Sequence, residues 1–167
     1  MALRNLRIEG DPILNKVSRP VTEMKDRYVE LIDDMLETMY ESNGVGLAAV
    51  QVGVLRRIVV IDVGEGPVVL INPEIIEADG EQTGQEGCLS VPDKVGIVTR
   101  PNHVKVRALD EEMNEFEFEA EGFFARACCH ELDHLDGHLY VEKVEGDLVD
   151  VSDAEEEIMG EAGEIEE

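Results

Sequence analysis

The 167-residue sequence has no tryptophan and only three cysteines, two of which, Cys128 and Cys129, are adjacent. An odd number of cysteines with this spacing does not make the disulfide framework of a small secreted domain. The sequence also lacks any apolar run of about 18 residues and any apolar segment near the N-terminus that would indicate a signal peptide. We therefore expect a soluble, cytoplasmic chain with no membrane span.

Basic residues are scarce as well: 14 lysines and arginines face 39 acidic residues, for a net charge of −25. This balance argues against direct nucleic-acid binding, which relies on cations that displace counterions from phosphates. The charge is concentrated at the C-terminus, because residues 145–167 contain 11 acids and no lysine or arginine. We expect one folded domain over residues 1–144 and an acidic tail over 145–167. Ser152 and Glu155 resemble a capping box, yet the few apolar residues beyond them favour a frayed helix or disorder.

Hydrophobic periodicity predicts one amphipathic helix and several strands. Apolar residues between positions 25 and 40 recur at helical spacing, and Gly44 follows as a stop signal. Strands are expected at 58–63, 68–72, 95–99, 103–109 and 115–120. The last two alternate apolar and polar residues around a short polar turn, which predicts an antiparallel hairpin.

A second helix is predicted over residues 123–136, ended by Gly137. It is apolar on nearly every side, which predicts burial between layers. It nevertheless contains His130, Glu131 and His134 in the pattern His-Glu-Leu-Asp-His. Residues i and i+4 of a helix share one face, so both imidazoles can reach one metal ion with the glutamate beside it. The alternative is a pair of hydrogen-bonded core histidines.

A catalytic site of this type needs a third protein ligand and an open position. Tyr140 stands where a metzincin would have its third histidine. Cys88, in the segment 86–92, is the strongest remaining candidate, because its flanks predict a loop or strand end that can present a thiolate. Cys128 and Cys129 lie on other sides of the predicted helix than His130, and we expect them in the core. We expect His103 and His138 at the surface.

The segment 44–51, Gly-Val-Gly-Leu-Ala-Ala-Val-Gln, has the spacing of a dinucleotide-binding fingerprint. It follows a predicted helix and opens no βαβ unit, so we reject that interpretation. Two alternatives remain for Gln51. It is either a donor to a developing oxyanion at the wall of a site, or a buried, hydrogen-bonded residue beside a helix stop.

Together, segments 44–51, 86–90 and 130–137 resemble the three signature motifs of the peptide deformylase family, in the family's order. The resemblance implies an α+β fold with antiparallel sheets around a central buried helix that carries the His-Glu-x-x-His motif. It implies one divalent metal ion, with Fe²⁺ as the physiological ion and Zn²⁺, Ni²⁺ or Co²⁺ as replacements. The implied roles are metal ligation by Cys88, His130 and His134, acid–base catalysis by Glu131, and an oxyanion hole from Gln51 and the Leu89 backbone N–H.

The implied reaction removes the N-formyl group from formyl-methionyl nascent polypeptides and releases formate. The substrate peptide is expected to pair as an added β-strand with the backbone near Val45, Gly46 and Gly87. Val45, Phe123 and Ala127 are expected to line a pocket for the methionine side chain. We expect the Arg126 stem to join that wall with its guanidinium pointing outward, and Glu86 to pair with Arg100. A monomer is expected.

Two features depart from the family pattern. Cys129 replaces the glutamine that commonly precedes the first motif histidine, and the acidic tail is unlike the basic C-terminal helix with which some members dock on ribosomes. The sequence leaves two alternative functions open. One is a gluzincin-like endoprotease whose third ligand is a later acid such as Glu155. The other is a non-enzymatic metal-buffering or docking protein that uses the tail as a charged arm.

Overall fold

The computed structural model describes residues 2–152, so the predicted behaviour of the segment from Ser152 to Glu155 lies almost entirely outside the described residues. The α-helices are Asp26–Glu41 (α1) and Phe123–Leu135 (α2). Three short 3₁₀ helices are Pro12–Asn15 (η1), Ala49–Val52 (η2) and Tyr140–Lys143 (η3). The strands are Gly46–Ala48 (β1), Ile58–Ile61 (β2), Val68–Asp79 (β3), Gln82–Cys88 (β4), Val91–Arg100 (β5), His103–Leu109 (β6), Glu115–Glu121 (β7) and Glu145–Asp150 (β8).

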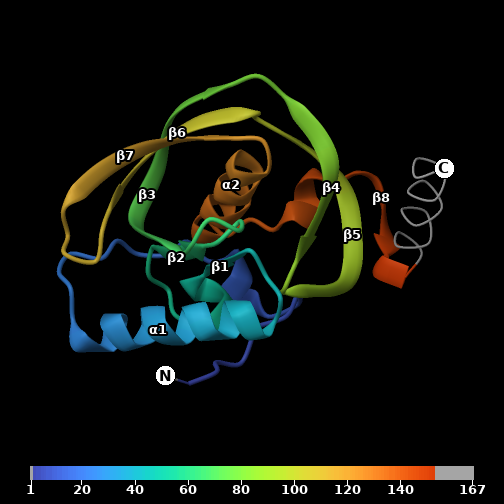
Figure 1. Ribbon diagram of the computed structural model, residues 1–167. Helices are drawn as coiled ribbons and strands as arrows, with labels where there is room; N and C mark the ends of the chain where they lie inside the picture. The colour runs from blue at the N-terminus through green and yellow to red at the C-terminus, as the bar shows by residue number, and fades with distance from the viewer. Residues whose placement is uncertain (1, 153–167) are drawn as a thin grey trace.

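The strands form two antiparallel sheets, one ordered β1-β2-β3-β6-β7 and the other β4-β5-β8. Helix α2 packs against both sheets and is enclosed between them, whereas α1 packs on the outside against β1 and β2 (Figure 1). The expected mixture of helices and antiparallel sheets is therefore confirmed. The described helices include none that is long and apolar enough to cross a membrane.

Each helix follows from its sequence pattern. The buried side of α1 includes Leu31, Ile32, Met35 and Met39, and it also holds the acid Asp34, whereas Asp33 faces solvent. Helix α2 is buried along most of its length and ends at Leu135. Gly137, just beyond it, has a φ of 83°, and a Cβ there would lie 2.6 Å from the Asn15 carbonyl oxygen. Both the turn and the close approach of the backbone thus require glycine.

The strands agree with the sequence pattern where apolar and polar residues alternate. The β6–β7 hairpin is confirmed, and it pairs Val104 with Ala120 and Val106 with Phe118. Strands β1, β4 and β8 were not predicted, and β3 continues to Asp79, beyond the expected end at residue 72. Strand β4 contains glycine and polar residues and is held by backbone pairing with β5, so it has little hydrophobic signal of its own.

Residues 145–150, which the sequence pattern assigns to the acidic tail, form β8 and pair with β5. Lys94 of β5 forms an ion pair with Asp150, and the Thr99 hydroxyl donates to Glu145 at 3.0 Å. Leu148 packs against the small cluster that includes Val98 and Tyr140. Acidic residues at this edge are therefore compatible with a strand, because cross-strand partners compensate their charge.

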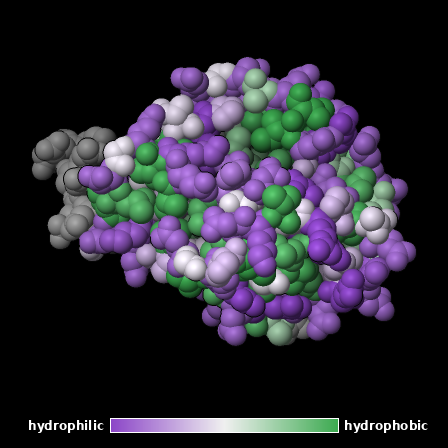
Figure 2. Space-filling model, turned by 180° about the vertical axis from the view of Figure 1, so that it is seen from behind, coloured by the Kyte–Doolittle hydropathy of each residue, from purple (hydrophilic) through white to green (hydrophobic). Residues whose placement is uncertain are grey.

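The back of the molecule carries hydrophilic side chains with apolar patches scattered among them (Figure 2). This distribution agrees with a sequence in which charged residues make up 32% of the chain. The two larger clusters of buried apolar side chains lie on either side of the five-stranded sheet, one towards α2 and the other towards α1. The five-stranded sheet thus lies between the apolar cluster around α2 and the apolar cluster around α1.

Candidate metal centre

Three potential metal ligands converge where the end of β4 meets α2. His130 and His134 lie one turn apart on α2, and their Nε2 atoms are 3.2 Å apart. The Cys88 Sγ atom, at the end of β4, is 3.3 Å from the His134 Nε2 atom. All three ligand atoms lie within 4.8 Å of one another. The β4–β5 register shifts between Gly87 and Cys88, an irregularity of the kind that redirects a side chain at the edge of a sheet.

A buried carboxylate, Glu86, organises the groups behind this cluster. It accepts hydrogen bonds from Arg100 at 2.6 Å and Arg126 at 2.8 Å, and its Oε1 atom lies 2.5 Å from His130 Nδ1. Arg100 also pairs with Asp133 at 2.6 Å. Burial raises the pKa of Glu86, but its hydrogen bonds with His130 and Arg100 outweigh burial and lower that pKa to about 2. Glu86 is therefore ionised and turns the His130 Nε2 atom towards the cluster.

The predicted Glu86–Arg100 pair is confirmed, whereas the expected outward direction of the Arg126 guanidinium is wrong. Arg126 is only 5% exposed, and its guanidinium pairs with Glu86 inside the protein. The physical reason is that the buried Glu86 carboxylate needs ion pairs to compensate its charge, and the Arg126 guanidinium provides one. The two groups meet only when β4 packs against α2.

Glu131 lies beside the three potential ligands and is almost completely buried. Burial raises its pKa to about 7. Its Oε1 atom has no hydrogen-bond partner among the described residues. Gly46 of β1 lies against the same carboxylate, because a Cβ at position 46 would be 2.5 Å from Glu131 Oε2. The carboxylate is thus held in place by close packing, while one oxygen remains available.

Gln51, on η2, points its side-chain amide at the same cluster. Its Oε1 atom accepts the Ala48 N–H at 2.9 Å, which fixes the orientation of the amide group. Its Nε2 atom donates to Ser90 Oγ at 3.0 Å and lies 3.6 Å from Cys88 Sγ. The sequence pattern did not identify Ser90 as a partner of Gln51; its position in the segment 86–90 was the only available signal.

A cavity of about 180 Å³ opens onto this cluster. Every residue that the sequence singled out for catalysis or substrate binding lines it, and so do Cys88 and His130, whereas His134 lies fully buried behind the wall. Gln85 also lines the cavity and was not predicted. The complete lining is Val45, Gly46, Gln51, Gln85, Glu86, Gly87, Cys88, Leu89, Phe123, Arg126, Ala127, His130 and Glu131.

The four cysteine and histidine side chains that we did not expect at the metal site lie outside it. Cys128 and Cys129 are buried in the core, and burial raises their pKa values to about 12 and about 11, respectively. His138 is exposed and lies 3.4 Å from Glu142. His103, on β6, lies 2.9 Å from Glu119. Neither histidine lines the cavity.

The donor set fits one divalent metal ion. Two imidazole nitrogens and a thiol sulfur face one another with too little space for side-chain atoms between them. Burial lowers the pKa of His134 well below its ordinary value, so this ring is neutral and offers a lone pair. Glu131, Cys88 and Glu86 outweigh burial at His130 and raise its pKa, so a metal ion would compete with a proton for that ring. The adjoining cavity leaves one side of the set accessible, as a catalytic site of the zinc type requires.

Comparisons with known proteins agree with this geometry. The model of the polypeptide deformylase family matches residues 3–148. A peptide deformylase of Agathobacter rectalis is 73% identical over 91% of this chain and 96% of its own length. A peptide deformylase of Lachnoclostridium phytofermentans is 63% identical over 94% of this chain and 98% of its own. The crystal structure of the Thermotoga maritima peptide deformylase has a TM-score of 0.84 and 42% identity, covering 86% of this chain and 99% of that one.

Proposed function

Because this chain belongs to the peptide deformylase family, we propose that Cys88, His130 and His134 bind its single metal ion. The chain is a metal-dependent hydrolase that removes the N-formyl group from nascent polypeptides. One observation carries the assignment of the ligands: a thiol from β4 meets two imidazoles of α2 within 4.8 Å. In this proposal α2 is the central helix of a catalytic domain, and amphipathic α1 supports the outer face of the larger sheet.

Glu131 is proposed as the general acid–base. The bound ion supplies Lewis-acid activation of water and of the formyl carbonyl group. Glu131, with a pKa of about 7, accepts a proton from the attacking water and later donates it to the departing amine. The free Oε1 atom and the close packing of Gly46 support this role, since they leave one oxygen available and fix the carboxylate.

Gln51 and the backbone N–H of Leu89 are proposed to stabilise the carbonyl oxygen as it becomes negative. The Ala48 N–H holds Gln51 Oε1, so the Nε2 group is the part of the amide that faces the site. Such a donor contributes about 3–4 kcal/mol of transition-state stabilisation in other enzymes. Because η2 and β4 position the two donors in advance, little reorganisation is needed during the reaction.

The peptide is proposed to bind between two sheet edges. Strand β1 ends the larger sheet and β4 ends the smaller one, and both line the cavity. Backbone groups of Val45, Gly46 and Gly87 are therefore placed to pair with an extended peptide. The half-exposed Phe123, with Ala127 and the buried stem of Arg126, forms the apolar wall proposed to accept the methionine side chain.

The remaining assignments concern the ion and the molecular context. We propose Fe²⁺ as the physiological ion, with Zn²⁺, Ni²⁺ or Co²⁺ able to bind the same donors. We propose a monomer that acts in the cytoplasm, where nascent chains emerge, without direct contact with nucleic acid. The net charge of −25 supports the last point, because it opposes a phosphate backbone. The catalytic domain is proposed to include β8, since β8 completes the smaller sheet.

The test pairs Cys88→Ala with Glu131→Gln, using anaerobic protein, elemental analysis and formate release from a formyl-methionyl peptide. Cys88→Ala should lose both the metal and the activity. Glu131→Gln should keep the metal and lose about 10²–10⁴-fold in turnover. Cys129→Ala is the matched control, because it removes a nearby buried thiol that does not line the cavity. Full metal content and activity in Cys88→Ala would contradict the ligand assignment and favour a protease-like third ligand such as Glu155.

A further inference from the structure

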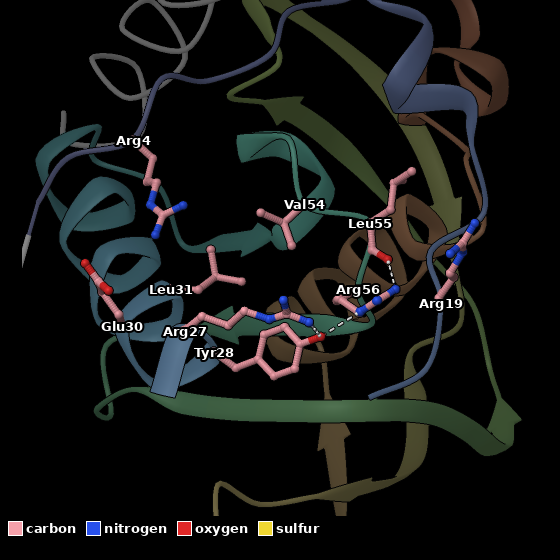
Figure 3. A pocket seen from close by; sticks show the side chains of 9 residues that line it. All are labelled: Arg4, Arg19, Arg27, Tyr28, Glu30, Leu31, Val54, Leu55 and Arg56. Carbon is pink, nitrogen blue, oxygen red and sulfur yellow. Dashed lines mark hydrogen bonds between the residues drawn. The ribbon is translucent and has the colours of Figure 1, made fainter. Parts of the chain in front are cut away.

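A second cavity, unrelated to the metal centre, lies on the α1 side of the larger sheet. Its volume is about 500 Å³, and we call it the arginine pocket. It is formed by the N-terminal segment, the start of α1 and the residues that precede β2 (Figure 3). The lining contains four arginines and one acid: Arg4, Arg19, Arg27, Arg56, Tyr28, Glu30, Leu31, Val54 and Leu55.

Two of these arginines meet at one neutral oxygen. Arg56 Nε donates to the Tyr28 hydroxyl at 2.8 Å, and Arg27 Nη2 donates to the same oxygen at 3.2 Å (Figure 3). The Arg27 guanidinium also lies over the Tyr28 ring, 5.0 Å from its centroid. The hydrogen bond from Arg56 lowers the pKa of the Tyr28 phenol, and Arg27 lowers it further. Two like charges are thus held close together at the edge of one cavity.

No carboxylate of the described chain neutralises this pair. Arg4 forms an ion pair with Asp34, but Arg19, Arg27 and Arg56 form none among residues 2–152. This is unusual in a protein with 39 acidic residues and 14 basic ones, in which most cations can find a partner. Three uncompensated guanidinium groups around a cavity repel one another, and an anion that enters the cavity would relieve that repulsion.

The arginines suit the oxygens of a phosphate, and the cavity volume favours a small ligand over a polymer. A guanidinium presents a planar fork of donors that matches phosphate oxygens. The cavity volume falls within the range of about 300–1,000 Å³ that is typical of small-molecule sites. A nucleic-acid strand would extend beyond the pocket and meet the surrounding acidic surface, which repels it. Leu31, Val54 and Leu55 add an apolar wall for a non-polar part of the ligand.

We propose that the arginine pocket binds a small phosphate-bearing anion of about nucleotide size. Arg27 and Arg56 supply the charge-assisted hydrogen bonds, and Arg19 supplies a third cation. The site is independent of the deformylase chemistry, since the five-stranded sheet lies between it and α2.

The test is isothermal titration calorimetry of the metal-loaded, full-length chain with inorganic pyrophosphate and with ATP, at constant ionic strength. Arg27→Gln and Arg19→Gln should each weaken binding by about tenfold, the effect of losing one charge-assisted hydrogen bond. Arg107→Gln is the matched control, because it makes the same change in net charge at an exposed ion pair with Glu74, outside the pocket. Unchanged deformylase activity would verify that the variants are folded.

Each result of the titrations either supports or overturns the proposal. Equal affinity for pyrophosphate and ATP would support recognition of the phosphate groups alone, and tighter binding of ATP would support use of the apolar wall as well. The proposal would be overturned if neither anion bound. It would also be overturned if Arg27→Gln and Arg19→Gln bound as tightly as Arg107→Gln, since the anion would then bind outside the arginine pocket. Tighter binding of an RNA duplex than of either small anion would overturn the assignment to a small molecule.

Discussion

One carboxylate, Glu86, links the metal centre to the charged interior of the protein. It lies between Arg100 and Arg126 and contacts His130 on the side away from the cluster of potential ligands. Each of these contacts involves a group that is almost completely buried. Removing the negative charge would leave the Arg126 guanidinium without its carboxylate partner and Arg100 with Asp133 alone, and it would release the imidazole from its fixed orientation.

Glu86→Gln should therefore weaken metal binding by about 10–100-fold, the usual effect of losing the partner of a metal-bound histidine. Competition with a chelator measures the affinity, and thermal unfolding of the same samples reports stability. Glu119→Gln is the control, because this exposed acid pairs with His103 far from the cavity. Unaltered metal affinity in Glu86→Gln would show that Glu86 only neutralises the arginines.

At the level of elements, β1 sets the position of the Glu131 carboxylate on α2. Gly46→Ala should place a Cβ 2.5 Å from Glu131 Oε2, so the carboxylate must move. We expect a lower kcat with retained metal, since the three atoms nearest to a Cβ at position 46 all belong to Glu131 and none to a potential ligand. Steady-state kinetics and elemental analysis measure the two effects. Wild-type kcat in this variant would show that Glu131 tolerates displacement.

The N-terminal segment is fastened to α1 through Asp34, which gives a pH-dependent contribution to stability. Burial raises the pKa of Asp34, but the Ala2 N–H and the Arg4 guanidinium outweigh burial and hold the pKa below its ordinary value of 3.8. A lowered pKa in the folded state stabilises the protein above the ordinary value, and this stabilisation is lost as the pH falls through the folded value.

Asp34→Asn should accordingly cost about 1–2 kcal/mol of unfolding free energy at pH 7. The difference from wild type should shrink as the pH falls below the ordinary pKa of 3.8 and through the lower pKa of the folded carboxyl. Urea unfolding at a series of pH values measures both. The neighbouring exposed Asp33→Asn serves as the control. A difference that is constant with pH would rule out the ion pair as its cause.

For the whole molecule, the described fold extends beyond residue 144 and includes β8. A chain that ends at Ser152 keeps β8 and should keep deformylase activity. A chain that ends at Val144 removes the partner of β5, together with the Lys94–Asp150 ion pair, and should unfold at a lower temperature. Formate release and thermal unfolding compare the two chains. Loss of formate release on removal of residues 153–167 alone would favour an acid of that segment, such as Glu155, as the third ligand.

Much of the fold was predictable where the signal is local. The His-Glu-x-x-His spacing, the alternation in β6 and β7, and the periodicity of α1 and α2 each depend on neighbours within a turn or a strand. Strands β1 and β4 carry no such signal, because β1 has only three residues, β4 consists mainly of glycine and polar residues, and both are ordered by backbone pairing with neighbouring strands. The ligand cluster shows the same division, since the sequence indicated Cys88 by elimination and by resemblance, without any geometric link to α2.

The order of the amino acids is enough to predict which chemical groups are available and how residues a few positions apart are arranged, since helix and strand periodicity are properties of the local chain. Folding was needed to bring Cys88 to His134, to turn Arg126 inward to Glu86, and to gather four arginines around one cavity. These arrangements depend on contacts between segments far apart in the chain, and the energy of a buried charge is defined only once its partners and its solvent exposure are known.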